Sequence, residues 1–227
     1  MIGGSSELGA ACAESLAARG AVTVFTYSRG EHAAARTLGR LDRYAVPVEA
    51  IRSDATRSDD VARLFSGVAT RHGGVDIVVH TVGLRRSKSL ADSTDADFDR
   101  LIDSNTRSVY HTLRAAARQL ADHGRYVVIG SALAPAGRGL YAAAKAAVEM
   151  LVVAGAHELA ARDITVNAVA PGPIGDDAAG DPVPPSPRGR LGQPEDVARV
   201  VDWLTSAGAD WVSGQIIRAD GCTRQIH

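Results

Sequence analysis

Short apolar runs alternate with longer segments of helical spacing along the chain. The apolar runs predict strands over residues 21–27, 44–51, 75–83, 125–131, 164–172 and 213–221. The longer segments predict helices over residues 10–20, 30–41, 58–73, 97–124, 141–163 and 193–208, with Ser58 as an N-cap and Gly124 as a helix end. This alternation indicates an α/β fold, in which a mostly parallel sheet is covered by helices on both faces.

The segments with unusual chemistry all follow predicted strands. They are residues 3–9, 28–29, 54–55, 80–83, 131 and 171–174. Because ligands of parallel α/β sheets bind at the carboxyl ends of the strands, we expect one site at this edge. Residues 172–190 are rich in Pro, Gly and Asp, which excludes a regular element and predicts a lid loop over about residues 173–190.

A glycine turn precedes the first predicted helix. Gly3, Gly4 and Gly9 surround the helix start, where glycine lets backbone N–H groups approach a ligand closely. Together with the helix N-terminus and the hydroxyls of Ser5 and Ser6, they predict an anion site of the kind that binds a pyrophosphate. The alternative is an ordinary Gly-Ser turn with a helix cap.

A tyrosine and a lysine share one face of the helix predicted over 141–163. Tyr141 and Lys145 stand at positions i and i+4, so the ammonium lies near the phenol and favours its ionised form. Such a tyrosine can act as a general acid or base. Ser131, at the end of the preceding strand, can hydrogen-bond a carbonyl oxygen that gains negative charge. Taken alone, the Tyr-Lys pair is a weak signal.

Composition narrows the functional classes. Lys plus Arg is 25 and Asp plus Glu is 26, a net charge of −1 that does not favour nucleic acid or a membrane surface. The two cysteines, Cys12 and Cys222, predict neither a disulfide framework nor a metal site. We identify no apolar run of transmembrane length and no secretion signal, and we expect a cytoplasmic protein.

The motifs together resemble the short-chain dehydrogenase/reductase family, of the classical single-domain type. The matching segments are residues 2–9 (IGGSSELG), residues 80–83 (HTVG), Asn105, the set of Ser131, Tyr141 and Lys145, the pair Pro171 and Gly172, and residues 190–221. The resemblance covers the whole chain, and it implies one Rossmann-like, doubly wound parallel sheet over residues 1–227. It also implies an NAD(P)-dependent oxidoreductase acting on alcohols and ketones.

The resemblance implies a role for each matching residue. Tyr141 would protonate the carbonyl oxygen, Lys145 would assist it and bind the nicotinamide ribose, and Ser131 would orient the carbonyl. Asn105 would hold a water molecule in a proton relay. The cofactor contacts would come from Gly3, Ser5, Ser6, Leu8, Gly9, Ser28, Arg29, Asp54, Ala55, His80, Val82, Gly83, Tyr141, Lys145, Pro171, Gly172 and Ile174.

The strand over 21–27 favours NADPH as the cofactor. It ends without the acidic residue that would bind the ribose 2′-OH of NAD, and Ser28 and Arg29 follow it. A guanidinium suits a 2′-phosphate, so NADPH is expected and NAD is less favoured. Asp54 matches an adenine contact of the family, with a helix-capping role as the alternative.

Several positions depart from the family pattern. Glu7 replaces a glycine, and we expect it to point outward from the first turn of the helix. His80 and Thr81 replace an Asn pair, and the position of His80 implies backbone support near the adenosine ribose rather than acid–base catalysis. The interval from Ser131 to Tyr141 is shorter than in the family, which reshapes the substrate pocket.

The first strand of the family, which is central in its sheet, has no counterpart before the glycine turn. Unpaired backbone groups cost about 1–3 kcal/mol each, so we predict roughly six to ten further residues upstream of Met1. A chain that starts at Met1 would fold weakly or rebuild its sheet, because a slot would remain in the core.

We expect a homotetramer or homodimer, because the predicted helices over 97–122 and 141–160 are apolar on more than one face. The alternative is that these residues only face the sheet. The expected function is the NADPH-dependent reduction of a ketone, or the oxidation of a secondary alcohol, on a small molecule. The four-residue Tyr141–Lys145 spacing resembles carbonyl reductases more than enoyl reductases. A catalytically silent dinucleotide-binding homologue is the main alternative, and an α/β domain without a dinucleotide is a third.

Overall fold

The computed structural model describes residues 1–85, 88–132, 139–175 and 186–223. Within these residues the strands are β1 (Thr23–Tyr27), β2 (Val48–Arg52), β3 (Val75–His80), β4 (Leu120–Ile129), β5 (Thr165–Pro171) and β6 (Ile216–Ala219). The α-helices are α1 (Glu7–Ala18), α2 (Glu31–Leu41), α3 (Ser58–His72), α4 (Asp95–Leu101), α5 (Ser108–Gln119), α6 (Gly139–Leu159) and α7 (Pro194–Leu204). Strands and helices therefore alternate as predicted.

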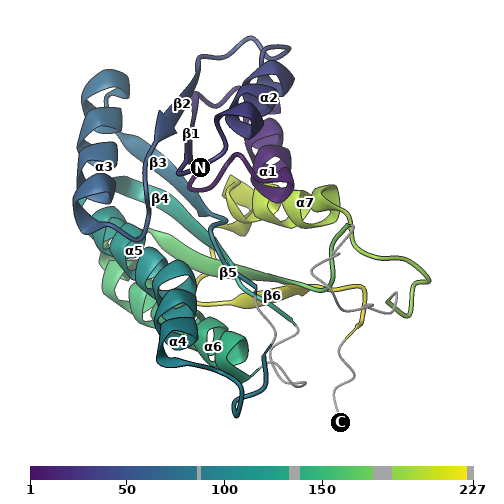
Figure 1. Ribbon diagram of the computed structural model, residues 1–227. Helices are drawn as coiled ribbons and strands as arrows, with labels where there is room; N and C mark the ends of the chain where they lie inside the picture. The colour runs from purple at the N-terminus through teal and green to yellow at the C-terminus, as the bar shows by residue number, and fades with distance from the viewer. Residues whose placement is uncertain (86–87, 133–138, 176–185, 224–227) are drawn as a thin grey trace.

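The strands form a layer between two layers of helices (Figure 1). Helices α1, α2 and α7 cover one face, and α3, α5 and α6 cover the other. All strand pairs are parallel, and the order β3-β4-β5-β6 makes a four-stranded sheet. The Rossmann-like α/β fold expected from the sequence is confirmed.

The sheet is divided into two hydrogen-bonded parts. Strands β1 and β2 form a separate two-stranded sheet, with Thr23 opposite Val48. Between β1 and β3 lie Met1 and Ile2, where Ile2 makes an isolated parallel bridge to His80. The slot expected from the sequence is present at this position, and the sheet is not rebuilt around it.

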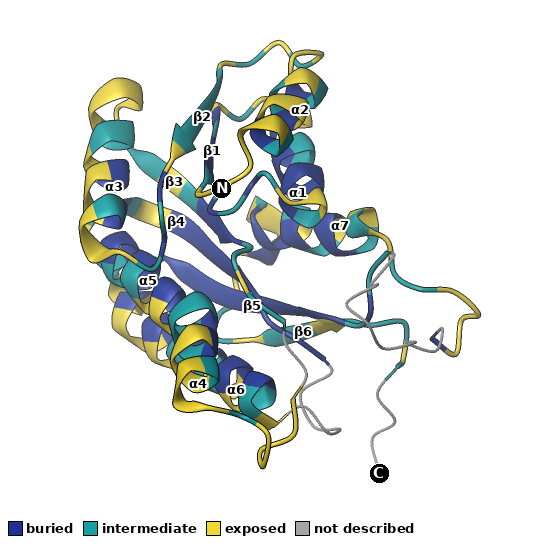
Figure 2. Ribbon diagram, in the orientation of Figure 1, coloured by how far each residue is buried: buried dark blue, intermediate teal, exposed yellow. Residues whose placement is uncertain are grey.

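Apolar side chains fill both faces of the sheet, and the middle strands are buried along most of their length (Figure 2). One core cluster includes Phe65 of α3, Val128 of β4 and Val152 of α6. A second joins Leu16 of α1 and Val201 of α7 to Val169 of β5. Continuous burial on two faces explains why the strand sequences read as apolar runs rather than as alternating patterns.

The segment predicted as one helix over 97–124 has three parts, and this prediction is wrong in detail. Helix α4 begins at a capping box formed by Thr94 and Asp97 and leads into a π-helix, η1 (Ile102–Arg107), before α5. The helix ends at Gln119, because Leu120 is extended and pairs with Val75 of β3. Tertiary pairing therefore overrides the local helical pattern of residues 120–124.

The start of α3 also differs from the prediction. Arg57 is the N-cap residue and Ser58 is the first helical residue. The Ser58 hydroxyl accepts a hydrogen bond from Arg114 Nη2 at 3.0 Å, so it serves the contact between α3 and α5 instead of capping α3.

The segment Gly139–Arg162 is long and apolar enough to cross a membrane by length and composition. Lys145, Glu149 and Glu158 interrupt this segment, so it is not the continuous apolar run that the sequence analysis looked for. The core helix of a globular protein meets the same criterion. Here Ala144, Val148 and Val152 of this segment are fully buried within the fold.

Candidate active site at the carboxyl ends of the strands

The glycine turn between Ile2 and α1 has no room for side chains. Gly3 has a φ of +86° and donates its N–H to Thr26 Oγ1 at 3.0 Å. A Cβ atom at Gly4 would lie 2.5 Å from Phe25 Cβ, and one at Gly9 would collide with the Gly3 carbonyl oxygen. The three glycines are therefore required by close packing and backbone conformation, as the sequence suggested.

Ser6 caps α1 at the same turn. Its Oγ accepts a hydrogen bond from Gly9 N at 3.0 Å and donates one to Gly3 O at 3.1 Å. Glu7 points away from the turn, where it is exposed and pairs with Arg40 Nη1 at 2.9 Å. The outward direction predicted for Glu7 is confirmed, so its carboxylate leaves the helix N-terminus accessible to an anion. Ser5 and Leu8 lie half-buried beside this turn.

The segment after β3 is tied to the glycine turn. Thr81 Oγ1 donates to Ile2 O at 2.9 Å and contacts Gly3 O at 3.1 Å. Val82 also lies against Gly3, because a Cβ atom there would be 2.8 Å from Val82 Cγ2. The two segments that the sequence assigned to one cofactor, residues 3–9 and 80–83, are therefore adjacent. Thr26 and Thr81 hold them together, and the sequence reading missed this role.

His80 ends β3 inside a buried polar network. Its Nδ1 is 3.0 Å from Thr112 Oγ1, its Nε2 is 3.3 Å from Ser108 Oγ, and Thr112 Oγ1 is 2.8 Å from Tyr126 Oη. Burial, with a smaller effect from the Lys145 charge, lowers the pKa of His80 to about 3. The imidazole is neutral at physiological pH. Its hydrogen bonds join the end of β3 to α5, in keeping with a supporting role.

Asn105 lies fully buried in the π-helix η1. Its Oδ1 accepts from Leu84 N at 3.2 Å, and its Nδ2 donates to Leu84 O at 2.9 Å and Leu101 O at 3.0 Å. The amide therefore fixes the backbone that follows Gly83. A π-helix segment inside a longer helix is frequent at functional sites, and here it places Asn105 beside the predicted catalytic residues.

Ser131 follows β4 and is buried. The residues on either side of it are anchored to β5, because Gly130 N donates to Val169 O at 2.7 Å and Ala132 N donates to Pro171 O at 2.9 Å. Ser131 is therefore held at the carboxyl end of the sheet, at the edge where the sequence placed it.

Tyr141 and Lys145 are both buried on one face of α6. Lys145 Nζ lies 6.0 Å from the centre of the Tyr141 ring and donates to Ile129 O at 2.8 Å. Burial lowers the pKa of Lys145 to about 8, so the ammonium remains mostly charged at neutral pH. A Cβ atom at Gly83 would lie 2.9 Å from Asn105 Oδ1 and 3.3 Å from Lys145 Nζ. Gly83 therefore lies beside both Asn105 and Lys145, which come from two other predicted segments.

The outer cofactor residues lie at the ends of β1 and β2. Ser28 and Arg29 are exposed immediately after β1, so they are open to a ligand. Asp54 Oδ1 accepts from Thr56 N at 3.0 Å and Thr56 Oγ1 at 2.8 Å. This carboxylate stabilises its own turn before α3, which favours the local structural role over the adenine contact. Ala55, beside it, is buried.

The carboxyl end of β5 forms the last part of the predicted site. Gly172 N contacts Ala219 O at 3.4 Å, and Ile174 makes an isolated bridge to Gly192. A Cβ atom at Gly172 would lie 3.0 Å from Asp220 O, just after β6, so a side chain here would push against this backbone. Residues 176–185 of the predicted lid, and residues 133–138 between Ser131 and Tyr141, lie outside the described residues.

Comparison with known proteins identifies the family. A family model described as Enoyl-(Acyl carrier protein) reductase matches residues 3–223. The chain is 32% identical to the short-chain dehydrogenase/reductase FrzI of a Cladobotryum species, over 96% of this chain and 92% of that protein. It is also 32% identical to versicolorin reductase 1 of Aspergillus parasiticus, over 96% of this chain and 93% of that protein.

The fold has close counterparts among solved structures. A blue fluorescent protein from a metagenomic library, solved in complex with NADPH, superposes with a TM-score of 0.91. The two are 31% identical, over 99% of this chain and 96% of that chain. The matching family model, the full-length relatives and this fold agree with the order of the motifs. The chain therefore belongs to the short-chain dehydrogenase/reductase family and is an NAD(P)-dependent oxidoreductase.

Proposed function

We propose that the protein reduces a ketone with NADPH, or oxidises the corresponding secondary alcohol, with Tyr141 as general acid or base. The observation that carries this proposal is the buried pair of Tyr141 and Lys145 on α6, next to Gly83 and Asn105. Relatives such as versicolorin reductase 1 are named as reductases, which supports the direction of reduction.

The residues present fit a dinucleotide. The turn of Gly3, Gly4 and Gly9 leaves space only for backbone, and Ser6 fixes it at the N-terminus of α1, where N–H groups and the helix dipole favour a pyrophosphate. Exposed Arg29 suits a 2′-phosphate, and the neighbour solved with NADPH supports the same cofactor.

The chemistry of the chain's own residues follows from their placement. Bound NADPH supplies a hydride to the carbonyl carbon. Tyr141 donates its phenolic proton to the carbonyl oxygen, and the nearby Lys145 ammonium stabilises the phenolate that remains. Ser131 hydrogen-bonds the same oxygen and orients it. Asn105 holds the backbone after Gly83 and, in this proposal, a water molecule that returns a proton to Tyr141.

A second candidate is the reduction of a carbon–carbon double bond, which the description of the matching family model favours. The four-residue separation of Tyr141 and Lys145 favours the carbonyl reaction. Assays with NADPH on a panel of ketones and on α,β-unsaturated thioesters separate the two candidates. Turnover of the thioesters alone would contradict the carbonyl proposal.

The cofactor choice is tested by titrating the chain with NADPH and NADH and following thermal unfolding. We expect NADPH to bind at least about tenfold more tightly, because one charge-assisted hydrogen bond contributes about 1.5–3 kcal/mol. Arg29→Ala should remove most of this preference, while Arg36→Ala, on the neighbouring α2, serves as a matched control. Equal affinities for the two cofactors would contradict the assignment. Binding without any Tyr141-dependent turnover would favour the catalytically silent alternative.

We also propose a cytoplasmic homotetramer or homodimer that pairs through α5 and α6. Tyr110 on α5 is 44% exposed and Met150 on α6 is 63% exposed, and Ala143, Ala146 and Ala154 of α6 are exposed as well. Light scattering of the purified chain, compared with Met150→Glu, measures the assembly. A monomer at micromolar concentration would contradict it.

A further inference from the structure

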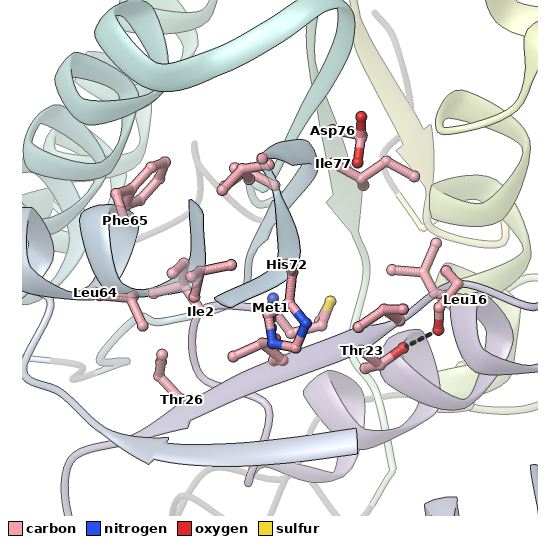
Figure 3. A pocket seen from close by; sticks show the side chains of 17 residues that line it. Met1, Ile2, Leu16, Thr23, Thr26, Leu64, Phe65, His72, Asp76 and Ile77 are labelled. Carbon is pink, nitrogen blue, oxygen red and sulfur yellow. Dashed lines mark hydrogen bonds between the residues drawn. The ribbon is translucent and has the colours of Figure 1, made fainter. Parts of the chain in front are cut away.

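A cavity of about 360 Å³ lies at the carboxyl ends of β5 and β6, beside the first turn of α7. Gly172 and Pro173 line it after β5, and Arg218 and Asp220 line it at the end of β6. This polar cavity differs in chemistry from the cavity of about 310 Å³ between β1 and β3, which is lined mostly by apolar side chains such as Leu64 (Figure 3). No step of the proposed reaction uses the polar cavity.

Charged side chains give the polar cavity a net positive charge. Those that line it are Arg188, Arg190, Arg218, Asp196 and Asp220. The charge of Arg190 is neutralised, because its Nη1 and Nη2 donate to the two carboxylate oxygens of Asp196 at 2.6 and 3.0 Å. Asp220 Oδ1 accepts from Cys222 N at 2.9 Å. The excess of positive charge therefore lies on Arg188 and Arg218.

Arg188 and Arg218 make no ion pair in the part of the chain that the structure describes. Both side chains are exposed, so a ligand can reach them from solvent. Two like charges on one cavity repel each other, and a bound anion would replace this repulsion by attraction to both groups. The arrangement therefore favours an anionic ligand.

A tight turn holds Arg188 at the cavity. Gly189 N donates to Ser186 O at 2.8 Å, and the Ser186 hydroxyl donates to Arg190 O at 2.9 Å, so Arg188 is the third residue of a closed four-residue turn. Ser186 is buried against the backbone that follows β6, because a Cβ atom at Gly221 would lie 2.8 Å from Ser186 Oγ. The same Cβ atom would lie 3.7 Å from Arg188 Cδ. The aliphatic part of Arg188 therefore lies over the end of β6.

We propose that the polar cavity binds the phosphate group of a small molecule between Arg188 and Arg218. A guanidinium is a planar fork that donates two parallel hydrogen bonds to an oxyanion. A phosphate monoester carries a charge of about −1.5 to −2 at neutral pH and three acceptor oxygens, so it can accept from both arginines at once. The volume of the cavity lies within the range of about 300–1,000 Å³ that small-molecule sites occupy. This inference does not depend on the proposed reaction.

The phosphate has two sources that fit this position. Strands β4 and β6 flank β5, and neighbouring strands lie about 4.8 Å apart, so the cavity is roughly 10 Å from Ser131 at the end of β4. A carbonyl substrate of that length can carry the phosphate at its far end. A separate phosphate-bearing ligand can also bind there while another molecule reacts.

Calorimetric titration with inorganic phosphate, at constant ionic strength and without dinucleotide, tests the proposal. Arg188→Gln and Arg218→Gln should each weaken phosphate binding at least about tenfold, because each removes charge-assisted hydrogen bonds. Arg199→Gln is the matched control, since this exposed arginine of α7 does not line the cavity, and it should leave the affinity unchanged. Phosphate bound near Arg29 would not respond to the cavity variants.

Three results would overturn the proposal. The first is a parent chain that does not bind phosphate at millimolar concentration. The second is equal phosphate affinity in the parent and in both cavity variants. The third is an equal loss of affinity in the Arg199→Gln control, because that would show a general effect of surface charge.

Steady-state kinetics with NADPH distinguish the two sources of the phosphate. Dihydroxyacetone phosphate and dihydroxyacetone serve as a matched pair of ketones with and without a phosphate. If the phosphate belongs to the substrate, Arg188→Gln should raise KM for the phosphorylated ketone alone, and inorganic phosphate should compete with it. If the ligand is separate, Arg188→Gln should leave both KM values unchanged. Either result supports the site, and the calorimetric test holds even where neither ketone is reduced, so the proposed reaction and this site can fail separately.

Discussion

Strands β1 and β3 behave differently at their two ends. At the carboxyl ends, Thr26 and Thr81 hydrogen-bond the backbone of Ile2 and Gly3, so both strands are joined through the glycine turn. At the amino ends, the same strands are separated by a cavity of about 310 Å³, which Val24 and Ile77 line. Side chains supply hydrogen-bond partners to the backbone at the active-site end, whereas a cavity lies between the two strands at the other end.

Each end also buries an amino group, with different consequences. Lys145 has a pKa of about 8 and keeps its charge at neutral pH, where the proposed mechanism needs it. The Met1 amine has a pKa of about 5 and is mostly neutral at the same pH. The active-site end therefore retains a buried charge, which the proposed mechanism uses, whereas the buried amine beside β1 loses its proton instead of keeping an unpaired charge.

The largest expected effect is a loss of activity at the active-site end that leaves the other end of the strands unchanged. Tyr141→Phe should lower the rate of NADPH-dependent ketone reduction by about 10²–10⁴-fold, because a general acid contributes that much. The free energy of unfolding and the exchange rate of the Val24 amide should not change. Steady-state kinetics and hydrogen exchange on the same sample measure both. A variant that keeps its rate would remove Tyr141 from the mechanism.

The next largest effect is a pH dependence of the unfolding free energy, which arises from the buried Met1 amine. The pKa of the Met1 amine falls from 8.0 to about 5 on folding, so the unfolded chain binds more protons between these values. Stability should therefore rise from pH 5 to pH 8, by up to about 4 kcal/mol from this group. Nα-acetylation should remove that part of the slope. Urea unfolding across this range, with and without the acetyl group, measures the difference, and parallel curves would contradict burial of the amine.

The packing of two phenylalanines also differs between the two ends of the strands. Phe25 is fully buried against the glycine turn, whereas Phe65 lines the cavity. Phe25→Ala should cost about 3–5 kcal/mol of unfolding free energy, and Phe65→Ala should cost about 1 kcal/mol less, because part of its surface already lacks neighbours. Urea denaturation measures both. Equal costs for the two variants would contradict the looser packing around Phe65.

The smallest expected effect is a change in NADPH affinity, which should differ between threonines at the two ends of the strands. Thr81→Val removes hydrogen bonds to Ile2 O and Gly3 O and should cost about 1 kcal/mol, with several-fold weaker NADPH binding. Thr23→Val removes a local bond to Ala21 O at the slot end and should leave NADPH binding unchanged. Calorimetric titration of both variants is the measurement. Equal losses of affinity would show that the threonines act through general stability.

Local patterns predicted most of the secondary structure and failed where a distant partner intervenes. The helix over 97–124 was extended too far, because nothing in residues 120–124 reveals that Leu120 pairs with Val75. Ser58 resembles an N-cap in sequence, yet its hydroxyl binds Arg114 on another helix. Both errors arise because a local sequence window contains no information about contacts between distant residues.

The sequence by itself determined the alternation of strands and helices, the family, and the residues of the proposed site, because each depends on short-range spacing and residue type. Only the tertiary structure decided how these residues are held: the neutral, bridging state of His80, the binding of the Asn105 amide to Leu84, and the outward position of Glu7. The slot between β1 and β3 was expected from the family pattern. The residues that line it, from β1, β3, α1 and α3, became visible only when segments distant in sequence were placed side by side.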